Sequence, residues 1–109
     1  MPEIPTGESI GNKDQPIWVE LSYQRADINL VHAYVDWLEA YEKGDEAVLV
    51  IGQTLQNRAN EWGSNIMHIA RASNPAAVAL YKRSEGYEYE GTKGTNEIFT
   101  KMFQPVLDV

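Results

Sequence analysis

The chain of 109 residues has no cysteine, only two histidines, and no apolar run approaching the ~20 residues of a membrane-spanning helix. Without cysteine, disulfides, thiolate catalysis and cysteine-ligated zinc are excluded. His32 and His68 fall on different predicted elements, so no metal-ligand spacing exists and we expect no metal. We expect a protein without membrane contact, located in the cytoplasm or within a viral particle.

Basic side chains are also scarce. Nine Lys and Arg face sixteen Asp and Glu, which gives an acidic protein with a net charge of −7. Nucleic-acid binding depends on Lys and Arg that neutralise phosphates, so we expect no nucleic-acid partner. An acidic protein attracts basic substrates and basic partner surfaces. The same charge is equally typical of a surface that only keeps a protein in solution.

The hydrophobic patterns predict an α+β fold, with a mixed β-sheet flanked by helices in the order strand-helix-helix-strand-helix-strand-strand. Alternation predicts a strand over 17–24, and helical spacing of apolar residues predicts a helix from Asp27 to Lys43. A second helix is predicted over 45–62, although 47–51 is also typical of a buried strand. A strand (65–70), a helix (76–84) and a hairpin (87–90 with 97–103) complete the chain.

The chain ends differ in composition from its middle. Residues 1–15 are polar, with two prolines and two glycines, and predict an extended N-terminal arm. Residues 16–103 form the single predicted domain, and 104–109 form a C-terminal tail. The arm is a candidate contact for an oligomer or an assembly. Trp18 lies on the polar face of its predicted strand, and an exposed tryptophan there would mark a contact surface.

The most distinctive segment begins at Asn74 and reads N-P-A-A-V-A-L-Y, with G-Y following at Gly86 and Tyr87. It resembles the N-x-x-A-x-x-L-Y motif, followed by G-F/Y, in the last helix of GNAT-type N-acetyltransferases. The predicted elements around it follow the order of that family's C-terminal part, so the resemblance covers residues 50–103. It implies acetyl-CoA as the acyl donor, with its pantetheine arm between two parallel strands that splay apart.

The resemblance also implies roles for particular residues. Tyr81 matches the tyrosine that protonates the departing thiolate, and Asn74 matches the asparagine that contacts the cofactor arm; Ala77 lies between them in the motif. The alternatives are that Tyr81 is an ordinary core residue and that Asn74 is only a helix N-cap. Gly52 is the sole match to the family's phosphate-binding loop, R/Q-x-x-G-x-G/A, which is otherwise missing.

Two functions follow. The first is an acyl-CoA-dependent N-acetyltransferase acting on an amine, or a shortened relative, as in some phage-type proteins, with a weakened acetyl-CoA site. The second is a catalytically silent structural or adaptor protein that docks to a protein partner in a larger assembly, such as a viral particle. Two further departures favour the second function. Five residues separate Tyr81 from Tyr87 where the family has four, and little room remains for the family's N-terminal elements.

Overall fold

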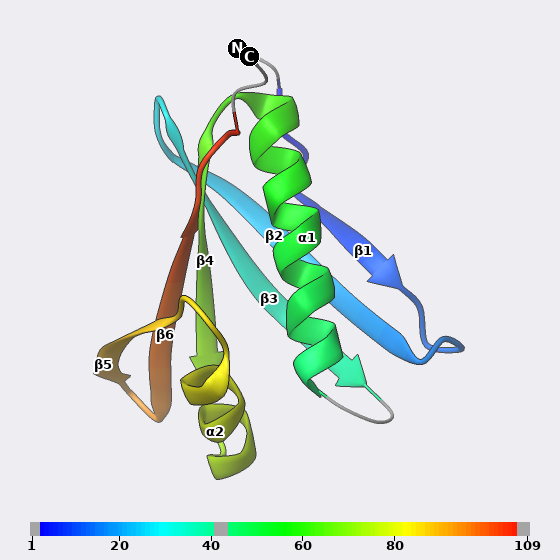
Figure 1. The fold of residues 1–109 in the computed structure, drawn as a ribbon, viewed down its shortest axis with the longest axis vertical. Coiled ribbons are helices and arrows are strands. Elements are labelled where there is room, and N and C mark those ends of the chain that lie inside the picture. The colour runs from blue at the N-terminus through cyan, green and yellow to red at the C-terminus, as the bar shows by residue number, and fades with distance from the viewer. Residues whose placement is uncertain (1–2, 41–43, 107–109) are drawn as a thin grey trace.

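The computed structural model describes residues 3–40 and 44–106. Within these residues, six strands form one mixed sheet and two helices pack against it (Figure 1). The predicted α+β class with a mixed sheet is confirmed. In chain order the elements are β1 (Gly7–Gly11), β2 (Ile17–Asp27), β3 (Leu30–Ala40), α1 (Gly44–Trp62), β4 (Asn65–Ala72), α2 (Pro75–Arg83), β5 (Glu88–Lys93) and β6 (Asn96–Phe103).

The strands lie in the order β1-β2-β3-β4-β6-β5. Neighbouring strands are antiparallel except β3 and β4, which run parallel and are connected by α1. A parallel pair needs a crossover of this kind because the chain must return to the same end of the sheet. The returning strand β6 lies between β4 and β5, so β4 is held by neighbours on both sides.

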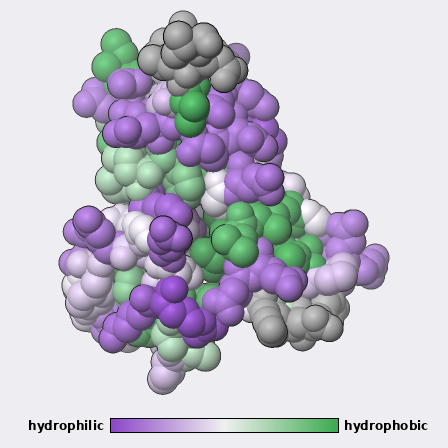
Figure 2. Space-filling model, viewed as in Figure 1, coloured by the Kyte–Doolittle hydropathy of each residue, from purple (hydrophilic) through white to green (hydrophobic). Residues whose placement is uncertain are grey.

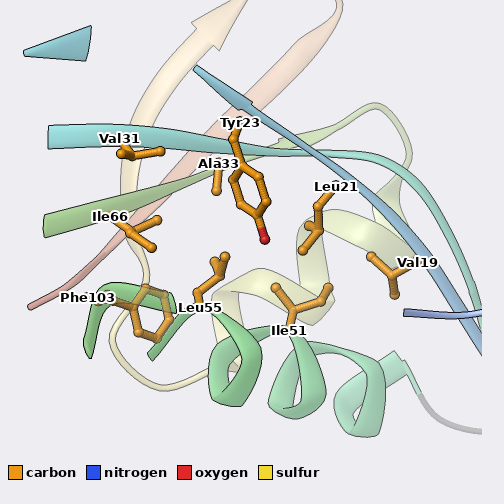
Figure 3. Close-up of a cluster of buried hydrophobic side chains, with 10 residues drawn as sticks. Val19, Leu21, Tyr23, Val31, Ala33, Ile51, Leu55, Ile66 and Phe103 are labelled. Atoms are coloured by element: carbon orange, nitrogen blue, oxygen red, sulfur yellow. The ribbon is translucent and has the colours of Figure 1, made fainter. Parts of the chain in front are cut away.

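The main core lies between α1 and the strands β2, β3, β4 and β6. Val19, Leu21 and Tyr23 alternate on β2 and point toward Ile51 and Leu55 of the helix (Figure 3). Period-two alternation on the strands and helical spacing on α1 bring these two apolar surfaces together. The remaining members come from β3, α1, β4 and β6, namely Val31, Ala33, Ala59, Ile66 and Phe103.

A second, smaller cluster joins α2 to the same face of the sheet. Ala70 and Ala72 of β4 pack with Leu80 and Tyr81, and Val48 of α1 belongs to this cluster too. Both helices therefore lie on one face, and within the described residues no helix covers the other. On the helical face, Figure 2 shows apolar surface around the N-terminal half of α1, where Leu49 is 73% exposed.

The helix predicted from Asp27 to Lys43 is wrong. Residues Leu30–Ala40 form strand β3, which pairs with β2 as a long antiparallel hairpin turning at Asp27–Leu30. The observed order thus has two strands in place of a predicted strand and helix. Residues 41–43, where that helix was predicted to end, lie outside the described residues.

The segment predicted as an arm contributes a strand to the sheet. Gly7–Gly11 pairs with β2, and Ile4 and Ile10 pack against the main core. Arg58 of α1 donates hydrogen bonds from Nε and Nη2 to the two carboxylate oxygens of Glu8, at 2.7 and 2.8 Å. These bonds hold the pKa of Glu8 below its usual value. At the other end of the chain, the Val106 N–H donates to Asn60 Oδ1 on α1, so the start of the tail is also held.

Candidate functional site

The parallel strands β3 and β4 separate along their length. They are paired from Leu30–Asn65 to Tyr34–Ile69, after which β3 continues to Ala40 and β4 to Ala72 without pairing to each other. Alternate backbone N–H and C=O groups of β3 beyond Tyr34 therefore lack a strand partner on that side. The resulting gap holds a hollow of about 250 Å³, lined by Val35, Asp36, Trp37, Leu38, Arg71, Ala77, Leu80 and Tyr81.

Helix α2 closes one side of this gap. Asn74 is its N-cap: the side-chain Oδ1 accepts a hydrogen bond of 2.9 Å from the Ala77 N–H, and Pro75 occupies the first turn. Both choices favour a helix start, because the cap satisfies a free N–H and proline has none to satisfy. The helix ends where the Ser84 hydroxyl donates to the Leu80 carbonyl. Its buried face then presents Tyr81 to the sheet.

Tyr81 is 5% exposed and lies among aromatic rings. Its ring stacks on Phe99 at 5.7 Å between centroids and contacts Tyr87 at 5.3 Å. Burial raises the pKa of Tyr81 to about 12, so the hydroxyl keeps its proton at neutral pH. No hydrogen bond of this hydroxyl is found within the described residues. A protonated hydroxyl that borders the gap without a partner is available to a bound group.

His68 lies behind Tyr81 and is completely buried. Its Nδ1 lies 2.6 Å from the Tyr87 hydroxyl, which can donate to it and thereby place the ring proton on Nε2. In the described part of the chain Nε2 has no hydrogen-bond partner. Burial, with a smaller effect from the Lys101 charge, lowers the pKa of His68 to about 4. The histidine is therefore neutral at physiological pH.

The depressed pKa of His68 predicts how the stability of the fold depends on pH. An unfolded histidine takes up a proton near pH 6.5, whereas the folded one resists protonation down to about pH 4. Between these values the unfolded state binds more protons, so stability falls as pH decreases, by up to about 1.4 kcal/mol per unit. Urea unfolding from pH 7 to 4.5 should show this slope, and His68→Gln should lose it. His32→Gln, at the half-exposed second histidine, should keep it; equal slopes in both variants would contradict the assignment.

Opposite charges meet at the mouth of the gap. Arg71 Nη2 of β4 lies 3.8 Å from Asp36 Oδ1 of β3, and both side chains are about half exposed. The guanidinium also lies over the Tyr34 ring, 5.4 Å from its centroid. An exposed pair at this separation contributes little to stability, at most about 1 kcal/mol. The pair instead places one acidic side chain, Asp36, on the β3 side of the opening and one basic side chain, Arg71, on the β4 side.

The structure brings together two of the four predicted site residues. Ala77 and Tyr81 both line the gap. Asn74 is engaged as the α2 cap and lines a neighbouring hollow of about 630 Å³ between α2 and the β5–β6 hairpin. Gly52 lies in the third turn of α1 and faces the Phe103 ring from a third hollow of about 360 Å³. As the helix predicted over 45–62 implies, Gly52 lies inside α1, which begins at Gly44, and not in a loop before the helix.

The true N-terminus of α1 is acidic. Asp45 and Glu46 occupy its first turn, and Asp45 is paired with Arg83 at 2.9 Å. A helix N-terminus attracts phosphate through its free N–H groups, but adjacent carboxylates repel the same anion. This helix start is therefore poorly suited to a pyrophosphate.

The sequence interpretation missed His68, Asp36 and Arg71 as neighbours of Tyr81. The signal that would have found them is the alternation of Val31, Ala33 and Val35, which is typical of a strand next to β4. The described residues contain no group of three or more His, Asp or Glu placed to hold a metal ion. Neither of the described helices is long and apolar enough to cross a membrane.

Comparison with known proteins gave no match to any family model and no significant match to a curated protein.

Proposed function

We propose that the protein is a GNAT-like acyl-CoA-dependent N-acetyltransferase, or a shortened relative with a weakened acetyl-CoA site. The observation that carries this proposal is the separation of β3 and β4 beyond Tyr34–Ile69, with Tyr81 bordering the gap. The parallel pair, the following helix with N-P-A-A-V-A-L-Y, and the final hairpin occur in the order that the resemblance implies. Such a gap accommodates an extended, narrow group such as a pantetheine arm.

The gap offers groups for each part of acyl transfer. A neutral amine attacks the thioester carbonyl, forming the C–N bond, and unpaired β3 backbone N–H groups stabilise the oxyanion. The intermediate then collapses: the C–S bond breaks, and the thiolate takes the proton of the Tyr81 hydroxyl. The product nitrogen releases one proton to solvent, and Tyr81 regains one from solvent. No charge or atom is left unbalanced.

The acidic start of α1 determines which part of the donor contributes to binding. Asp45 and Glu46 place carboxylates in the first turn of α1, where free backbone N–H groups would otherwise bind phosphate. We therefore expect the pantetheine arm to supply most of the affinity and the nucleotide phosphates to supply little. In this proposal acetyl-CoA is a substrate, and any affinity for it is weak.

Calorimetric titration with acetyl-CoA and with S-acetylpantetheine, which lacks the nucleotide, tests the proposal. Both ligands should bind, with dissociation constants within about tenfold of each other, a difference below about 1.4 kcal/mol. Ala77→Phe should abolish binding because the new ring fills the gap. Ala76→Phe, one residue earlier at an exposed position of α2, should leave binding intact.

If neither ligand binds at millimolar concentration, the acyl-transfer proposal fails. The second candidate is then the catalytically silent structural or adaptor protein that docks in a larger assembly. The acidic first turn of α1 favours this candidate, because it weakens the case for a phosphate-bearing donor. The second face of the sheet also favours it, because no helix in the described part of the chain covers this face.

A further inference from the structure

The β2–β3 hairpin carries a regular arrangement of tryptophan and glutamate on the sheet face that lacks helices. Trp18 pairs directly with Glu39, and Glu20 pairs directly with Trp37. Directly opposed residues, and residues two apart on one strand, share a face, so all four side chains project together. The two indoles meet diagonally with ring centroids 5.6 Å apart, and Glu20 and Glu39 occupy the other two positions of this pairing. We name these four residues the Trp–Glu platform.

The platform is open to solvent. Trp37 is 48% exposed and Trp18 is half-buried. On the edge side, the residue paired with Trp18 is Gly11, which has no side chain to cover the indole. Two adjacent indoles that both remain partly exposed form an apolar surface patch, and such patches mark contact sites.

Both charged residues of the platform, Glu20 and Glu39, are acidic. Glu20 accepts a hydrogen bond of 2.7 Å from the Ser9 hydroxyl, and neither Glu20 nor Glu39 forms an ion pair within the described residues. Arg71, at the adjacent gap, is already paired with Asp36. The platform thus combines aromatic faces with two carboxylates that form no ion pair within the described residues, and the chain as a whole carries a net charge of −7.

We propose that the Trp–Glu platform docks a lysine- or arginine-bearing segment of a partner protein. The methylene stems of such side chains lie along indole faces, while their cations interact with the rings and with the carboxylates. The long-range field of the acidic chain steers the same partner toward this face. Trp37 also lines the gap beside Tyr81, but the inference does not depend on acyl transfer, because it requires neither a bound thioester nor the Tyr81 hydroxyl.

A peptide titration followed by ¹H–¹⁵N NMR tests this proposal. The probe is a ten-residue Gly/Ser peptide that carries four lysines, compared with the same peptide carrying four glutamines. Two lysine contacts predict a dissociation constant on the order of 1 mM at low salt and weaker binding at high salt. The indole N–H signals of Trp18 and Trp37 should shift. The signal of Trp62, packed edge-to-face on Tyr23 in the core, should stay in place and serve as the internal reference.

Two variants and one matched control locate the site. Glu39→Gln should weaken binding about threefold, and Trp37→Thr, which keeps strand propensity, about three- to fivefold. Glu88→Gln removes the same charge from the exposed strand β5, at the opposite edge of the sheet, and should change nothing. If Glu88→Gln weakens binding as much as Glu39→Gln does, the peptide is bound only by the overall negative charge of the chain, and the proposal is overturned. Equal binding of the glutamine peptide, no binding at 5 mM, or spermidine binding as tightly as the lysine peptide would overturn it too.

Discussion

Phe99→Ala should destabilise the fold by about 4 kcal/mol and lower the melting temperature by about 15 °C or more. Phe99 is 1% exposed, and its ring lies between Tyr81 on α2 and Tyr89 on β5, at 5.7 and 5.3 Å between centroids. Truncation to alanine leaves a cavity at the point where α2, β4 and the β5–β6 hairpin meet. Typical total stabilities are about 5–15 kcal/mol, so a large part of the fold's margin would be lost.

The neighbouring residue on β6 provides the control. Ile98 points to the bare face of the sheet and is only half-buried, so Ile98→Ala should cost about 1 kcal/mol. Urea unfolding of the two variants in parallel gives the comparison. A loss below 1.5 kcal/mol in Phe99→Ala, or equal losses in both variants, would show that the second core cluster does not stabilise the fold as the burial suggests.

The sequence predicted the C-terminal half well because its signals are local. The cap at Asn74 followed by Pro75 marks the start of α2, and Gly63 and Gly86 adopt the positive φ values of 59° and 87° that favour glycine after a helix. The helix predicted over 45–62 is α1 (Gly44–Trp62). The strands predicted over 65–70 and 97–103 are β4 (Asn65–Ala72) and β6 (Asn96–Phe103). Each of these elements carries its own start or stop signal within a few residues.

The failed helix over β3 has a specific cause. Val31, Ala33 and Val35 alternate as a strand should, but the register with β2 then shifts by one residue at Asp36. Val35 pairs with Leu21 and Leu38 with Val19, so the inward-facing residues on β3 are spaced by three instead of two at that point. A β-bulge of this kind imitates helical spacing, and a pattern count alone cannot separate the two.

The sequence predicted only those residues of the site that lie close together in the chain. Tyr81 and Ala77 belong to one helix, so a single motif finds both. Arg71 and Asp36 approach each other only because β3 and β4 are parallel neighbours, and that pairing joins residues about 35 positions apart across α1. Strand β1 was missed for a similar reason, since Glu8 is tied to Arg58, fifty residues away. Contacts of this range leave no periodic trace in the sequence.

Tyr81→Phe should lower kcat for acetyl transfer by about 10²- to 10³-fold while leaving the affinity for S-acetylpantetheine nearly unchanged. The substitution keeps the ring that stacks on Phe99 and removes only the hydroxyl, which has no protein partner within the described residues. This expected loss of kcat is smaller than the ~10⁴-fold that the best general acids contribute, because a pKa of about 12 makes the Tyr81 hydroxyl a weak proton donor. The same pKa keeps the hydroxyl protonated, so its titration should cause no loss of kcat between pH 8 and 10.

Tyr87→Phe is the matched control for this measurement. It removes a second buried hydroxyl beside Tyr81, but one that is engaged with His68 Nδ1 and does not line the gap. We expect kcat to change less than about threefold, because this hydroxyl has no access to the leaving thiolate. Single-turnover rates with an excess of enzyme isolate the chemical step in both variants. If Tyr81→Phe retains kcat while Ala77→Phe abolishes binding, the gap holds the thioester but the thiolate departs without Tyr81, and its role as the acid is wrong.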